Sequence, residues 1–360
     1  MTIKSPLLAR PGAVEAGGAD AGVASHYGEP LREQRALAGG TAVVDLSHRG
    51  VVTVAGPDRL SWLNTLSSQQ LTNLEPGHSS ELLLLSVQGR IEFDARVVDD
   101  GATTWLIVEA AEAGPLAEWL NKMKFMLRVE IADASAEWAV LGSTRPVPEW
   151  SSLLVWEDPW PHVGAGGYSY AVVGENAHPG LERPWFEYLV PAAELEATVG
   201  DRPLAGVWAA EALRIAAWRP RWGAETDDKT IPHELDLLRT AVHLNKGCYK
   251  GQETVARVHN LGHPPRRLVF LQLDGSQHTL PAVGSEVRSG GRKVGTVTSV
   301  AQHYEMGPIA LAVVKRSVAP EEVLTVLDGE EPYTAAQEVI VAPDAGQVVG
   351  RQTGFLRGTR

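Results

Sequence analysis

The chain has 360 residues, 44% of them hydrophobic, a formal net charge of −12 and a single cysteine. This length predicts roughly two to three domains rather than one core. One cysteine excludes an internal disulfide and any metal or iron–sulfur site built only from cysteines of this chain, and it is typical of a cytoplasmic protein. The acidic charge argues against a broad nucleic-acid surface, and no apolar run is long enough to cross a membrane.

The first segment, residues 1–27, is rich in Gly, Ala and Pro, and we expect a mobile leader there. Residues 28–140 then alternate between strand and helix patterns. "GVVTVAG" is typical of a strand, Pro57 and Asp58 begin a helix, and "SELLLLSVQGRIEFDARVVDDGATTWLIVEA" predicts two or three strands before the helical "GPLAEWLNKMKFML". The alternation predicts a first α+β domain.

A Pro-, Gly- and Trp-rich excursion opens residues 141–204, for which we expect a second α+β domain. "LAGVWAAEALRIAAW" is the clearest helix of the chain, because its apolar residues recur at helical spacing. Short β-rich runs separated by glycine-rich turns fill residues 266–360 and predict a small C-terminal β-barrel.

The single cysteine, Cys248, lies in the most basic segment, "HLNKGCYKGQETVARVHNLGHPPRR". Lys246 and Lys250 flank it closely, and nearby cations favour the reactive thiolate. Gly247 and Gly251 indicate tight backbone turns. The segment therefore fits a reactive or ligand-contacting thiol, while a lone cysteine also fits a small buried hydrophobic residue, and local chemistry leaves both interpretations open.

The basic side chains of this segment reverse the sign of an otherwise acidic chain. Lys246, Lys250, Arg257, Arg266 and Arg267 fall within 22 positions. Such a cluster suits a carboxylate or phosphate ligand, and it equally suits a solvated loop. Elsewhere the sequence has no metal-spaced histidine set, no phosphate-binding glycine loop and no paired-glycine dinucleotide motif.

Four stretches resemble known families. "KGCYKGQE" followed by "VAR" is similar to the signature of the YgfZ-type folate-binding proteins. "DLSHRG" followed by "VTVAGPDRLSWLN" resembles the opening of the related glycine cleavage T-protein, an aminomethyltransferase. "ALRIAAWRPRWGAETDDKTIPHEL" and "VGTVTSVAQHYEMGPIALAVV" resemble segments common to both groups. Together the stretches span most of the chain from about Ala42 onward.

The resemblance implies an α+β fold of three domains in a ring, with residues 205–265 completing the first domain and tetrahydrofolate at the centre. It also implies a role in assembling or repairing iron–sulfur proteins, which would be the partners, with Cys248 as the working thiol. The residues that the resemblance assigns to folate are Lys246, Gly247, Tyr249, Gly251, Gln252, Glu253, Arg257, Arg214, Glu187 and Asp94.

Departures from the T-protein pattern favour the YgfZ-type branch. The T-protein run Arg-x-Glu-Ala-Gly, whose Glu addresses the pterin ring, matches Arg214 to Trp218 here, so Ala216 stands at the carboxylate position. The T-protein aspartate pair is reduced to Asp94 after Phe93, and Glu225 is a candidate replacement for the lost carboxylate. Because aminomethyl transfer needs such polar groups, the sequence leaves open whether the chain is an enzyme. A folate-dependent aminomethyltransferase or demethylase, and a scaffold with a vestigial folate pocket, remain the alternatives.

Overall fold

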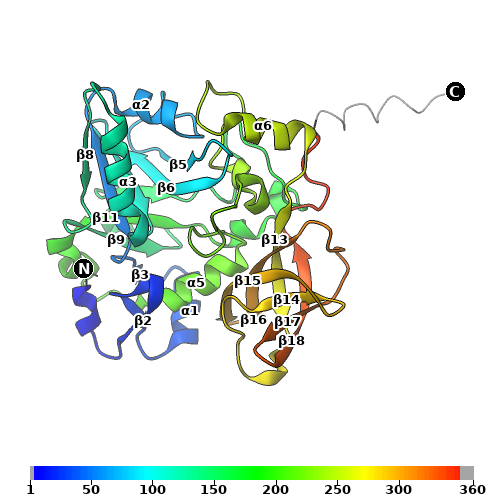
Figure 1. Cartoon of the computed structure of the whole chain (residues 1–360). Helices are drawn as coiled ribbons and strands as arrows, with labels where there is room; N and C mark the ends of the chain where they lie inside the picture. Colours follow the sequence, from blue (N-terminus) through cyan, green and yellow to red (C-terminus); the bar gives the residue numbers. More distant parts are fainter. Residues whose placement is uncertain (1–3, 349–360) are drawn as a thin grey trace.

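The computed structural model describes residues 4–348 and contains two five-stranded sheets and a closed six-stranded barrel. Figure 1 shows the barrel beside the body formed by the two sheets, with α5 at their junction. The helices are α1 (Pro30–Ala38), α2 (Arg59–Leu66), α3 (Ala110–Met123), α4 (Leu195–Val199), α5 (Val207–Ala216) and α6 (Gln252–Leu261). The predicted α+β class and C-terminal barrel are confirmed.

The first sheet is antiparallel and has the strand order β5-β6-β7-β4-β8. Its strands are β4 (Gly50–Ala55), β5 (Ser79–Leu85), β6 (Ile91–Asp99), β7 (Thr103–Val108) and β8 (Glu130–Asp133). Side chains alternate between its faces: Ala95 and Val97 of β6 pack in the core beneath α2 and α3, whereas Asp94 and Arg96 point to the opposite face. This second face is turned toward the other sheet.

The second sheet has the order β10-β11-β9-β3-β12, and only the β3–β12 pair is parallel. Its strands are β3 (Val43–Asp45), β9 (Trp138–Ser143), β10 (Leu154–Glu157), β11 (Phe186–Pro191) and β12 (Leu204–Ala205). One buried cluster contains Val44 and Val140 of this sheet together with Val98 and Ile107 of the first. The two sheets therefore share a core and act as one packed body.

The barrel closes in the order β13-β16-β15-β14-β17-β18, with β18 paired back to β13. Its strands are β13 (Arg266–Leu273), β14 (Glu286–Ser289), β15 (Arg292–His303), β16 (Gly307–Lys315), β17 (Leu324–Asp328) and β18 (Glu331–Val339). Alternate residues such as Val269 and Leu271 fill its interior, while Leu268 and Phe270 face outward into a second core. Closure leaves no unpaired sheet edge in this domain.

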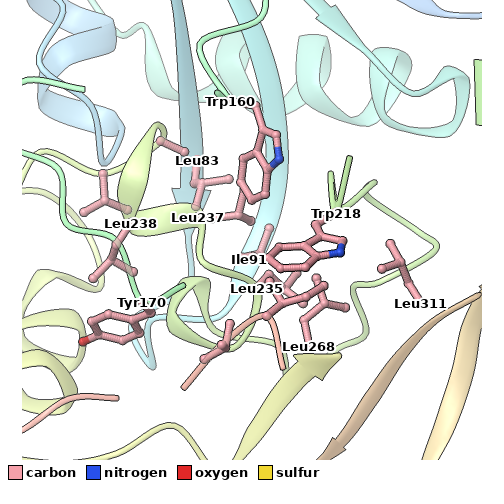
Figure 2. Packing of buried hydrophobic residues seen from close by; sticks show 14 of the residues in the cluster. Leu83, Ile91, Trp160, Tyr170, Trp218, Leu235, Leu237, Leu238, Leu268 and Leu311 are labelled. Carbon is pink, nitrogen blue, oxygen red and sulfur yellow. The ribbon is translucent and has the colours of Figure 1, made fainter. Parts of the chain in front are cut away.

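That second core joins the barrel to the first sheet. Figure 2 shows Leu83 and Ile91 of the first sheet, Trp218 after α5, and Leu268 and Leu311 of the barrel gathered in one cluster. Several further members, Leu235 to Val255, come from residues 217–261, so this segment is packed between two domains. Helix α5, within residues 205–265, contacts α1 and β3, which lie in the expected first domain, and also β12 and the barrel.

The N-terminal segment is also different from its prediction. In its described part it forms a short hairpin of β1 (Val14–Glu15) and β2 (Ala24–His26), and Leu7 and Val23 are fully buried. Its Gly-, Ala- and Pro-rich composition is typical of a flexible chain, but these two apolar side chains anchor it to the second sheet and to the shared core. The segment is therefore a structural part of the body formed by the two sheets. Strands β3 and β9, which begin within the expected first domain, belong to the second sheet.

Candidate functional site

Charged side chains fill the space between the two sheets, α5 and the barrel. We call this set the central charge cluster. Its acidic members are Asp20, Glu81, Asp94, Glu109, Asp158, Glu187, Glu211 and Glu225, its arginines are Arg49, Arg96, Arg183, Arg214, Arg219 and Arg221, and His48 lies beside Asp20. Since isolated charges are costly to bury, their pairing here is a condition for the fold.

Glu187 marks the second-sheet side of the central charge cluster. It is buried on β11, accepts a hydrogen bond from Trp185 Nε1 at 3.0 Å, and lies 3.3 Å from Arg96 Nε and 3.9 Å from Arg49 Nε. Burial alone would raise the pKa of this carboxyl, but the charges of Arg96 and Arg49 outweigh it and hold the pKa below its ordinary value. Glu187 is therefore an ionised carboxylate at neutral pH.

Asp94, on the first-sheet side, behaves in the opposite way. Burial and the negative charge of Glu81 raise the pKa of the half-buried Asp94 carboxyl to about 7. Beneath it, Glu112 accepts a hydrogen bond from Asp94 N at 2.9 Å, and burial raises the pKa of Glu112 to about 9. Asp94 can therefore hold or release a proton near neutral pH.

Arg214 of α5 ties the central charge cluster to the barrel. Its Nη1 donates to Glu225 at 3.0 Å and its Nη2 donates to Ser299 of β15 at 2.6 Å. Glu225 is buried and also accepts hydrogen bonds from Ser299 Oγ at 2.6 Å and Arg221 N at 2.9 Å. Both oxygens of Glu225 are therefore held by the protein, at the contact between α5 and the barrel.

A cleft of about 950 Å³ opens next to the central charge cluster. Its floor is formed by His48, Arg49, Glu109 and Arg221, and half-buried Trp222 lies on its wall. Further walls come from the N-terminal segment, the start of α3 and the loops at 133–136 and 223–224. The space left inside the central charge cluster itself is only about 20 Å³, so a ligand larger than a water molecule is accommodated by the cleft.

The floor of the cleft offers both signs of charge in contact. Glu109 is paired with Arg49, and its Oε2 lies 2.6 Å from Arg221 Nη2, which also lies 2.6 Å from Asp20. Burial would raise the pKa of Glu109, but Arg49 and Arg221 hold it well below its ordinary value. In addition, Arg49 Nε has no hydrogen-bond partner among the described residues. A ligand with adjacent donors and acceptors would find complementary groups here.

The basic residues near Cys248 do not converge on one ligand. Lys246 Nζ donates to the backbone oxygens of Asn64, Ser67 and Gln69, so it fastens the loop after α2, and burial lowers its pKa to about 8. Arg257 is exposed and pairs with Glu253 on the same helix. Lys250 donates to Glu92, and Arg266 donates to Asp227 and Glu234. Arg267 donates to the backbone oxygen of Val318. These five side chains therefore contact separate partners and do not meet at one point.

The other signature residues shape the loop that carries Cys248. Gly251 has φ +85, and a Cβ there would lie 2.6 Å from Ser86 O, so only glycine lets α6 begin against the β5–β6 turn. Tyr249 is buried in the core of Figure 2, and Gln252 reaches back toward Lys246 O at 3.4 Å. Cys248 itself is exposed and free. Gly247 and these residues line neither the cleft nor the central charge cluster.

Of the predicted ligand contacts, the structure thus brings together Asp94, Glu187 and Arg214. Sequence reasoning missed the charged residues that surround them, above all Arg49, Arg96, Glu109, Arg219 and Arg221. One signal was available: Asp94 and Arg96 alternate with buried Ala95 and Val97, so a charged face of β6 could have been predicted. Between residues 4 and 348 there is no metal-binding group of three His, Cys, Asp or Glu side chains, and no helix long and apolar enough to span a membrane.

Two protein-family models match this chain. A family model described as the GCVT N-terminal domain matches residues 24–144, and one described as the glycine cleavage T-protein C-terminal barrel domain matches residues 266–343. Together they match more than half of the chain. The chain belongs to the glycine cleavage T-protein family.

Relatives and a solved structure agree with this membership. An aminomethyltransferase of Symbiobacterium thermophilum is 28% identical over 297 residues, covering 76% of this chain and 78% of the relative. One of Nostoc is 29% identical over 306 residues, covering 80% of each. The crystal structure of the glycine cleavage system aminomethyltransferase T from Bartonella henselae superposes with a TM-score of 0.73 at 17% identity, covering 93% of this chain and 94% of that one. The T-protein fold is therefore confirmed.

Proposed function

We propose that this T-protein family member is a cytoplasmic folate-binding protein of the YgfZ-type branch that supports the assembly or repair of iron–sulfur proteins through Cys248. The proposal has two parts, a folate site at the cleft and a thiol on a separate surface. Each part has its own support and its own test.

The observation that carries the folate part is the cleft with paired charges on its floor. The predicted contacts Asp94, Glu187 and Arg214 lie in the adjoining central charge cluster and do not line the cleft. Its volume lies within the ~300–1,000 Å³ range of small-molecule sites. Tetrahydrofolate combines a planar ring that has hydrogen-bond donors beside acceptors with an anionic tail. Glu109 suits the donors, Arg49 and Arg221 suit the acceptors and the tail, and Trp222 offers a stacking face. Tetrahydrofolate would supply a carrier for a one-carbon unit.

The thiol part is supported by the exposure of Cys248 on a firmly held loop. On one side of Cys248 the loop is held by Lys246, which bonds Ser67 O. On the other side it is held by Gly251, where α6 begins against the β5–β6 turn, so the exposed thiol has a fixed position. One exposed cysteine can give a single ligand to a cluster whose other ligands come from a partner. Since Cys248 does not line the cleft, folate and an iron–sulfur partner would meet different surfaces of the protein.

A second candidate is folate-dependent aminomethyl transfer or demethylation. It is favoured by the names of the relatives and by Asp94, whose pKa of about 7 suits proton transfer at neutral pH. Against it, Ala216 stands where a T-protein has the carboxylate that addresses the pterin, and Glu225 is engaged elsewhere. Formation of methylenetetrahydrofolate from an aminomethyl donor, or from an N-methyl donor together with an added electron acceptor, would favour this candidate over the accessory role.

Anaerobic calorimetric titration with tetrahydrofolate tests the folate part. We expect saturable binding by the native protein and at least tenfold weaker binding by Arg221→Gln, because one charge on the cleft floor is lost. Arg288→Ala, a partly exposed barrel arginine paired with Glu286, is the matched control. Arg257→Ala examines the sequence-based alternative, and weakening by this variant alone would move the site to α6. If the native protein did not bind tetrahydrofolate, the remaining hypothesis would be a non-enzymatic scaffold with a vestigial folate pocket.

Complementation tests the thiol part. In cells that lack the protein, Cys248→Ser should fail to restore the activity of iron–sulfur enzymes while its tetrahydrofolate affinity stays native. If Cys248→Ser restored the activity of the iron–sulfur enzymes fully, the thiol would not be required for the function.

A further inference from the structure

The turn that follows α3 carries an unusual run of exposed apolar side chains. The exposed fractions are 46% for Met123, 89% for Phe125, 84% for Met126 and 42% for Leu127. We call these four residues the apolar tip. Single exposed apolar residues are common, whereas four within five positions form a patch of the kind found where proteins associate.

The backbone holds the apolar tip outward. Phe125 has φ +44, a left-handed conformation that costs a bulky residue on the order of 1 kcal/mol or more. Leu127 N bonds Lys124 O at 2.9 Å, and Asp58 accepts hydrogen bonds from Arg128 N at 2.9 Å and Nε at 3.1 Å. The turn is thus fixed at its base in a strained form that displays Phe125 and does not bury it.

The rim of the apolar tip is basic in a chain whose net charge is −12. Lys122 and Lys124 flank Met123, and Arg128 follows Leu127. The nearest acidic partner of Lys122, Glu118, lies 3.8 Å away with both side chains exposed, so this pair is weak. Lys122 and Lys124 therefore remain available to opposite charges from outside, whereas Arg128 is paired with Asp58 at 2.6 Å.

A groove beside the apolar tip borders the cleft. It has a volume of about 520 Å³ and is lined along α3 by Gly114, Ala117, Glu118, Asn121 and Lys122. Asp133 lines both this groove and the cleft, so the two are adjacent. The small side chains of Gly114 and Ala117 leave room for an extended segment of another molecule.

We propose that the apolar tip and the α3 groove form the docking surface for a protein partner with an acidic contact face. An apolar centre flanked by Lys122 and Lys124 matches the anatomy of protein interfaces, and the charge of these lysines is complementary to acidic residues. A symmetric contact with a second copy would bring Lys122 and Lys124 against their own counterparts. An anionic membrane would be repelled by the chain's charge of −12 beyond the tip.

Site-specific photo-crosslinking tests the docking surface. The full-length protein with Phe125→p-benzoylphenylalanine is expressed in the cells from which the chain comes, irradiated, and its adducts identified by mass spectrometry. The matched control carries the same crosslinker at Val87, which is 69% exposed on the β5–β6 turn. We expect one dominant protein adduct from position 125, with its crosslinked peptide rich in Asp and Glu, and none of it from position 87.

The identified partner is then purified and titrated with the native protein and two variants. Phe125→Ser combined with Met126→Ser, and Lys122→Glu combined with Lys124→Glu, should each weaken binding at least tenfold, and added salt should weaken native binding. Unchanged thermal unfolding of these surface variants shows that they remain folded. The proposal is overturned if position 125 crosslinks only to lipid or to a second copy, yields no specific adduct, or if both variants bind the partner normally.

Discussion

At the scale of single residues, Asp94 is the group whose chemistry depends most on its surroundings. It lies on the inner face of β6, opposite Leu83, and faces Glu81 as well as Arg96 and Arg219. Burial and Glu81 favour its neutral form, and the two arginines only partly offset this. A carboxyl that keeps its proton up to a pH of about 7 is a candidate for proton transfer, and it also makes stability depend on pH.

Asp94→Asn should flatten part of that pH dependence. The pKa of Asp94 rises from 3.8 to about 7 on folding, so the folded state binds more protons between these values and stability falls as pH rises through them. The variant should be more stable than the native protein at pH 8, on the order of 1–3 kcal/mol. Urea unfolding from pH 4 to pH 9 measures this, with Glu112→Gln as comparison, whose effect extends to about pH 9. Parallel curves for native protein and Asp94→Asn would contradict the assignment.

At the scale of elements, the N-terminal segment shows how few residues are needed to fix a chain with a flexible composition. Leu7 fills a pocket among Val43, Leu141 and Val190 of the second sheet. Asp20 adds an ion pair to Arg221 at 2.6 Å on the cleft floor. The segment is therefore both an anchor of the second sheet and a wall of the candidate site.

Leu7→Ala should accordingly destabilise the whole protein by about 2–5 kcal/mol, as expected for a fully buried leucine. Val14→Ala, in the same segment but 48% exposed, is the matched control and should change stability by less than about 0.5 kcal/mol. Chemical denaturation of both variants decides the matter. Equal and small effects would mean that the segment is a loose leader after all.

The same scale explains what could be predicted from the sequence. The helix at α5 and the β-runs of the barrel were predictable, because their patterns are local. The three-residue β3 was not assigned to its sheet, since it pairs with β9 and β12, which lie far along the chain. For the site, the family motifs pointed to Asp94, Glu187 and Arg214, whereas the partners of these residues follow from tertiary packing. The basic run around Cys248 suggested one shared anion site. In the structure these residues, although close in sequence, contact different partners.

At the scale of the whole molecule, the central charge cluster and the core of Figure 2 hold three domains together. Ser299 is the barrel's polar contribution to this junction, placed between Arg214 and Glu225 at 2.6 Å from each. If the barrel moved away, Glu225 would lose a donor and Arg214 an acceptor in a buried setting. The position of Arg221 on the cleft floor therefore depends indirectly on the barrel, since its backbone N also bonds Glu225.

Ser299→Ala should expose this dependence. We expect a loss of about 1–3 kcal/mol, because a buried carboxylate is left with an unmatched oxygen, and a separation of barrel unfolding from that of the two-sheet body. Thr298→Ala is the matched control, because this neighbouring hydroxyl donates its hydrogen bond to Leu311 O of β16, within the barrel itself. Differential scanning calorimetry should show a broadened or split transition for Ser299→Ala only. Identical transitions for the two variants would mean that the cores alone couple the domains, and that the polar junction serves the cleft without stabilising the assembly.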